Sequence, residues 1–172
     1  MNSPLPLTAT NTLQLLEHAN CAWDDELVAR LSQYIEVPAK SPGFDPDWAQ
    51  NAYLMKVVRD AADWITSRKI DGLQLEIVQI EGRTPVLFFE IPASNGDGSR
   101  AASGPLKGQT VLMYGHLDKQ PEFTGWRSDL GPWLAKYQDG RLYGRGGADD
   151  GYAVYAAVTA VEALKSQNAP HP

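Results

Sequence analysis

The chain has 172 residues, 43% of them hydrophobic, which is enough for one domain with a core and too few for two. A net charge of −6, with no block among the 15 Lys and Arg residues, argues against a nucleic-acid surface. The N-terminal segment lacks the regions of a signal peptide, and no apolar run approaches the ~18 residues of a membrane span. We therefore expect a cytoplasmic protein with neither a nucleic-acid nor a membrane partner.

Two segments of the first 72 residues have the periodicity of helices. In residues 24–37 apolar side chains recur at helical spacing behind two acidic residues, so we expect this helix to begin there. Asp45 and Pro46 form a cap and first-turn pair for a longer helix that stops at KIDG, residues 69–72. The only cysteine, Cys21, excludes an internal disulfide and is expected to be a buried apolar thiol.

The middle of the chain has the patterns of strands. Residues 73–80 alternate between apolar and polar, and residues 86–91 form a continuous apolar run typical of a strand covered on both faces. A Gly- and Ser-rich loop at 92–108 precedes a third predicted strand at 109–115. Within residues 126–144 a DG pair between two short segments suggests a hairpin.

The last element is an Ala-rich helix over residues 149–166. Strands followed by a helix predict an α/β fold, with a mixed or parallel sheet flanked by helices. A helix after a strand normally delivers the next strand, and here the chain ends instead. We therefore expect residues 1–172 to form a partial catalytic domain, truncated after this helix.

His116 and Asp118 follow the third predicted strand directly. Ligands gather outside the carboxyl ends of strands in open α/β sheets, and a carboxylate near a metal-bound imidazole often orients its ring. A hydrogen-bonded pair without a metal would also explain the two residues. The position favours the metal hypothesis without deciding it.

A second motif, YGRGGADDGYA at residues 143–153, runs three glycines into Asp149 and Asp150. Either acid could simply cap the following helix. The motif lacks the Gly-Lys-Ser/Thr ending of a phosphate loop, and Asp149 stands where a dinucleotide fingerprint has its third glycine. These features disfavour a small nucleotide-binding α/β protein.

Together the motifs resemble a known family. A strand ending in HLD, then Pro121, a Trp-containing loop and DGRLYGRGGADDG resemble the N-terminal half of the dinuclear zinc metallopeptidases. That family includes carnosine dipeptidases, aminoacylases, carboxypeptidase G and acetylornithine deacetylase. The resemblance covers roughly residues 24–166.

The resemblance implies roles for individual residues. His116 would bind one zinc, Asp118 would be the catalytic-site residue that orients it, and Asp149 would bridge two zinc ions. Asp150 matches the second acid of the family's pair, which is not usually a ligand. The chain departs from the common pattern at Lys119 among other positions, which bears on substrate contacts.

The resemblance also implies a fold and an activity. The fold would be an incomplete, phosphorylase/hydrolase-like zinc-peptidase domain without its lid domain. The activity would be metal-assisted hydrolysis of an amide bond in a dipeptide or N-acyl amino acid. In the family the general-base glutamate and the remaining metal ligands lie beyond the acid-pair helix, so we expect this chain alone to be inactive and to bind zinc weakly or not at all.

One alternative is a non-catalytic α/β binding or interaction module that keeps a relic half of a metal site. A distance separates the two hypotheses, because a ring nitrogen of His116 and the carboxylate of Asp149 must lie within ~5 Å to share a metal. Unpaired sheet surface also leads us to expect reduced stability or self-association.

Overall fold

A computed structural model describes residues 9–95 and 108–172 of the chain. The helices are α1 (Ala9–Ala22), α2 (Val28–Glu36), α3 (Trp48–Asn51), α4 (Tyr53–Ser67) and α5 (Tyr152–Ser166), with π-helical stretches η1 (Trp23–Leu27) and η2 (Gly147–Gly151). The strands are β1 (Gln74–Val78), β2 (Val86–Glu90), β3 (Lys136–Gln138) and β4 (Arg141–Tyr143). The α/β class predicted from the sequence is confirmed.

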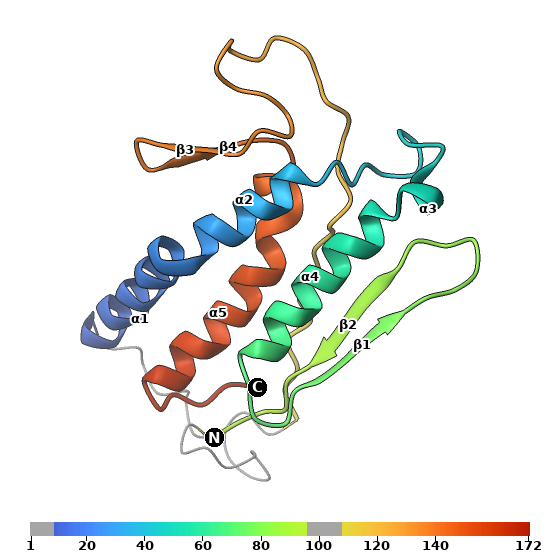
Figure 1. The fold of residues 1–172 in the computed structure, drawn as a ribbon. Helices are drawn as coiled ribbons and strands as arrows, with labels where there is room; N and C mark the ends of the chain where they lie inside the picture. The colour runs from blue at the N-terminus through green and yellow to red at the C-terminus, as the bar shows by residue number, and fades with distance from the viewer. Residues whose placement is uncertain (1–8, 96–107) are drawn as a thin grey trace.

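The core lies between the helices, which form the main layer of the molecule (Figure 1). Its largest fully buried side chain is Trp64 of α4, which packs edge-on against Tyr155 of α5 with ring centres 4.8 Å apart. A second apolar cluster joins the end of α2 to the start of α4. No helix in the described ranges is long and apolar enough to cross a membrane.

The first helix begins earlier than the sequence predicted. The chain is already helical from Ala9, and the acidic residues expected at its start lie in η1, inside one continuous helical run. Acidic side chains are favourable in a first turn but do not require one, so they marked the wrong boundary. Cys21 is exposed on α1 rather than buried, which corrects the second expectation for this region.

The second helical segment begins close to its predicted cap. The carboxylate of Asp45 accepts hydrogen bonds from the backbone of Asp47 at 3.2 Å and from the side chain of Asn51 at 2.9 Å. The helix is then interrupted at Ala52, whose φ of 56° lies in the left-handed region, so α3 and α4 are separate. Helix α4 ends at Ser67, before the predicted KIDG stop.

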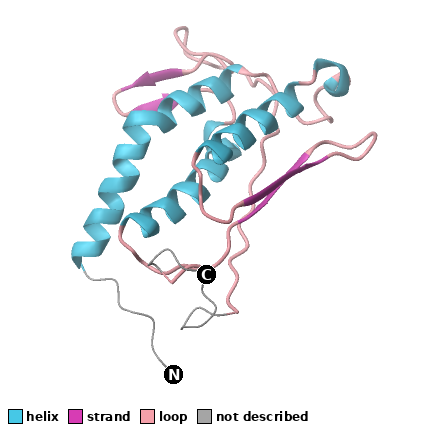
Figure 2. Cartoon of the chain, turned by 60° about the horizontal axis from the view of Figure 1, so that its bottom comes forward, coloured by secondary structure: helices cyan, strands magenta, loops and turns pink. Residues whose placement is uncertain are grey.

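The strands form two hairpins on different sides of the helical layer (Figure 2), and the second lies where the DG pair predicted one. Strands β1 and β2 pair antiparallel in the register Gln74↔Glu90 to Val78↔Val86 and lie beside α4. Strands β3 and β4 meet at Asp139 and Gly140, whose φ values of 53° and 73° suit a tight hairpin turn.

Two strand expectations were wrong. Strand β2 is covered on one face only, because Val86 and Phe88 are 57% and 55% exposed. Residues 109–115 make no strand, so the sheets of the described chain are two antiparallel hairpins rather than one mixed or parallel sheet. An apolar run becomes a strand only where a neighbour supplies hydrogen bonds. Most of the predicted loop at 92–108 lies outside the described residues.

Candidate metal centre

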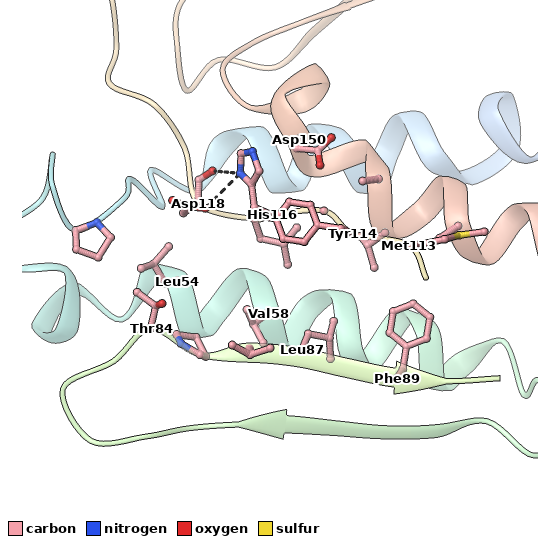
Figure 3. Close-up of a pocket in the computed structure, with 18 residues that line it drawn as sticks. Leu54, Val58, Thr84, Leu87, Phe89, Met113, Tyr114, His116, Asp118 and Asp150 are labelled. Atoms are coloured by element: carbon pink, nitrogen blue, oxygen red, sulfur yellow. Dashed lines mark hydrogen bonds and ion pairs between the residues drawn. The ribbon is translucent and has the colours of Figure 1, made fainter. Parts of the chain in front are cut away.

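His116 is held by its neighbour Asp118 (Figure 3). The ring nitrogen Nδ1 lies 3.0 Å from the Asp118 carbonyl oxygen and 3.2 Å from its carboxylate Oδ1. Both groups are acceptors, so they favour the tautomer with the proton on Nδ1. The lone pair of Nε2 is then available to a metal ion.

Asp149 faces that second ring nitrogen. Its Oδ1 lies 3.4 Å from His116 Nε2, so the proximity expected for a shared metal is confirmed. Asp149 and Asp150 have non-helical backbone angles within η2, and α5 starts only at Tyr152. The N-cap of α5 is Gly151, and no side chain caps this helix end. The capping role considered for the two acids is therefore not observed.

The spacing of His116 and Asp149 fits a cation between them. Zinc–ligand bonds of about 2.0–2.1 Å in a tetrahedral site put two ligand atoms roughly 3.3 Å apart. With the proton on Nδ1, both facing atoms are acceptors, and a shared proton or cation is needed to make their approach favourable. The Asp149 carboxylate is 58% exposed, which leaves its second oxygen open to another partner. The donor set therefore suits zinc.

Asp118 is itself held in place by Ser41, which lies in the N-terminal half of the chain. The Ser41 hydroxyl donates a hydrogen bond to Asp118 Oδ2, and the Ser41 backbone N–H donates to the Lys119 carbonyl at 2.9 Å. Ser41 lies within the range 24–166 that the family resemblance covers, but nothing in the sequence assigned this residue a contact. Ser41 is thus a part of the site that sequence reasoning missed.

Lys119, which the sequence connected with substrate contacts, lies elsewhere. Its side chain is completely buried and turns toward the end of α2 instead of toward a substrate. Burial lowers the pKa of Lys119 to about 7. Burial also raises the pKa of Tyr34 above its ordinary value, so its hydroxyl remains a donor, to the Leu117 carbonyl at 3.0 Å.

A cleft of about 490 Å³ opens beside the centre, between α4, β2 and the start of α5 (Figure 3). Its titratable lining groups are Tyr114, His116, Asp118 and Asp150, and most of the remaining wall is apolar. The apolar wall is formed mainly by Leu54, Val58, Val86, Leu87, Phe89, Met113, Leu117, Ala153, Val154 and Ala157.

Other candidate ligands in the described ranges do not join the pair. No group of three or more His, Cys, Asp or Glu side chains there could hold a metal ion. Glu122 makes an ion pair with Lys40 at 3.0 Å. His171 is buried beside the C-terminus, where its backbone pairs with Ser94. The metal roles of His116 and Asp149 remain predictions supported by their geometry.

Comparison with known proteins identifies related chains. Residues 112–172, which contain both motifs, match the Peptidase family M20/M25/M40. The human Beta-Ala-His dipeptidase is 31% identical over 95% of this chain and 30% of that protein. The Cys-Gly metallodipeptidase dug1 of Schizosaccharomyces pombe is 28% identical over 86% of this chain and 29% of that protein.

The fold has a solved counterpart. The crystal structure of human carnosine dipeptidase 1 matches with a TM-score of 0.59 and 26% identity, covering 97% of this chain and 33% of that one. The present chain thus spans about 30% of the length of the curated relatives described above. The resemblance that the two motifs predicted, to the metallopeptidase family that includes the carnosine dipeptidases, is thereby confirmed.

Proposed function

We propose that this chain forms the N-terminal part of the catalytic domain of a zinc-dependent metallopeptidase. The substrate class would be dipeptides or N-acyl amino acids. The observation that carries the proposal is the 3.4 Å approach of His116 Nε2 to Asp149 Oδ1, with His116 oriented by Asp118. The dipeptidase names of its relatives support the choice of substrate class.

Each residue has a distinct task in this proposal. Asp118 keeps the proton on Nδ1 of His116, which directs the Nε2 lone pair toward the metal position. Asp149 offers two carboxylate oxygens and a negative charge, which suits a position between two cations. When bound there, zinc would supply a Lewis acid that polarises the scissile carbonyl.

The small number of protein ligands in this chain predicts weak zinc binding. A catalytic zinc usually has three protein ligands, and the described residues supply His116 and Asp149. We therefore expect the 172-residue chain on its own to bind zinc weakly and to leave dipeptides uncleaved. The alternative of a relic, non-catalytic module predicts no zinc preference for this pair.

Zinc titration by calorimetry tests the proposal on the wild-type chain, His116→Ala and Asp149→Ala. We expect weak binding in the wild type and its loss in either variant, because each removes one of two ligands. His18→Ala is the matched control, since it removes an imidazole of α1 that has no role at the centre. Equal binding by wild type and both site variants would refute the metal roles, and sub-micromolar binding would show a complete site in this chain alone.

A further inference from the structure

Lys119 is the one lysine among the fully buried side chains of the described structure, with 0% of its surface exposed. Its ammonium nitrogen donates to three backbone carbonyls at the C-terminal end of α2, those of Tyr34 at 2.5 Å, Ile35 at 3.3 Å and Val37 at 2.6 Å. A helix C-terminus carries partial negative charge and leaves carbonyls without helical partners, so it offers acceptors to the N–H donors of a lysine. The three donors of an ammonium group match these three acceptors.

Aromatic rings lie close to the ammonium group of Lys119, and the glycine loop encloses its aliphatic stem. The ammonium nitrogen lies 3.9 Å from the centre of the Tyr34 ring and 5.3 Å from that of Trp133. The aliphatic stem lies against Gly146, where a Cβ atom would come within 2.8 Å of the Lys119 Cγ. Gly146 therefore provides the space that the lysine stem occupies, three residues before Asp149.

The main chain of Lys119 is fixed as well. Its N–H donates to the Ala39 carbonyl at 2.9 Å, and its own carbonyl accepts from Ser41 at 2.9 Å. This short parallel bridge fixes the turn that carries His116 and Asp118 to the segment after α2. Lys119, which lies on segment 116–121, thus contacts two segments that are far from it in sequence, namely 34–41 and the loop at 144–147, and joins all three.

We propose that Lys119 is a positioning residue for the metal centre. Its buried side chain fastens the His116 turn and the Asp149 loop to the end of α2, and so sets the separation of the two facing ligand atoms. The identity of the ion rests on the proposed function, but the positioning of His116 against Asp149 does not.

Lys119→Met tests this assignment, because it keeps an unbranched apolar stem and removes the donors to the three carbonyls. Two measurements are made by NMR on the ¹⁵N-labelled chain. Ring ¹⁵N shifts of His116 without metal report which nitrogen carries the proton, and titration with Zn²⁺ alone reports the affinity. We expect altered ring shifts and an affinity lower by about tenfold or more, as for other residues that orient metal ligands.

The matched control is Ile65→Val, which perturbs a fully buried side chain of the Trp64 cluster, a cluster that includes no residue of the three segments. We expect it to lower stability and to leave both the His116 ring shifts and the zinc affinity unchanged. This control separates positioning from general destabilisation.

The outcomes distinguish this assignment from the proposed function. A folded Lys119→Met chain with wild-type ring shifts and zinc affinity would overturn the positioning role. If Zn²⁺ shifts resonances elsewhere in the wild-type chain but not those of His116, the metal role in the proposed function fails, while the metal-free ring shifts still decide the role of Lys119. Should Lys119→Met not fold, Lys119→Gln, which removes the charge and keeps two of the three N–H donors, is measured in the same way. We then expect ring shifts and a zinc affinity between those of the wild type and a full loss, and wild-type values of both would overturn the positioning role.

Discussion

Two parts of one segment, seven residues apart, reverse the usual relation between residue type and burial. Leu112 is 90% exposed, whereas Lys119 is completely buried. The lysine has partners from α2, from the bridge with residues 39–41 and from the glycine loop. Around Leu112 the segment pairs with no strand in the described structure. Partners from distant segments, more than side-chain polarity, therefore decide burial here.

The largest expected effect on stability comes from the dense packing around Lys119. In Gly151→Ala the new Cβ would lie 2.1 Å from Cε1 of Tyr34, the ring that supports Lys119. We expect the free energy of unfolding to fall by about 3 kcal/mol, since overpacking forces the ring or the backbone to move. Urea unfolding measures the loss.

Gly43→Ala is the control for that substitution. A Cβ at Gly43 would meet no atom within 4 Å, so its effect should stay within about 0.5 kcal/mol. Equal stability of the two variants would show that Gly151 has more room than the close approach to Tyr34 implies.

The next largest expected effect is a pH dependence of the free energy of unfolding, caused by the shifted pKa of Lys119. Burial lowers the pKa of Lys119 from 10.5 to about 7, so between pH 7 and 10.5 the unfolded chain binds more protons than the folded one. The free energy of unfolding should therefore rise with pH in this window, by at most about 1.4 kcal/mol per pH unit. Below pH 7 both states are protonated, and the cost of burying the charge is fully present.

Urea unfolding at pH 7, 8 and 9 of the wild type and Lys119→Met measures this contribution, because other groups titrate in both chains and cancel in the difference. Staying below pH 10 avoids the buried tyrosines, since burial raises the pKa of Tyr155 to about 12. If the free energies of unfolding of the two chains change with pH in parallel, folding does not lower the pKa of Lys119.

Local patterns were sufficient for much of the fold. The strand segments of β1 and β2, the DG turn at 139–140 and the stop of α4 follow from periodicity and turn residues within a few positions. The strand expected at 109–115 failed because strand formation depends on a hydrogen-bonding neighbour elsewhere in the chain. A local apolar pattern carries no information about that neighbour.

The residues of the site likewise divide into those that the sequence indicates and those that only the structure reveals. His116, Asp118 and Asp149 could be singled out from two motifs and from their family resemblance. Ser41 and Tyr34 could not, because they reach the site across 77 and 83 residues of sequence. Lys119 was visible only as a departure from the common motif, and its burial depends on carbonyls at the end of α2 that no pattern in its own segment indicates.

The smallest effect on stability is expected at the exposed segment around Leu112. Residues 111–114 expose four apolar side chains in a row, with Leu112 and Tyr114 at 90% and 84%. We expect the wild-type chain to self-associate through this surface, because an unpaired apolar edge favours contact with another strand. Leu112→Glu should shift sedimentation toward monomer at a given concentration while changing the free energy of unfolding by less than about 0.5 kcal/mol. Leu16→Glu, at an exposed leucine of α1, is the matched control and should leave association unchanged. Identical sedimentation of Leu112→Glu and the wild type would mean that this edge, although exposed, is not where copies of the chain meet.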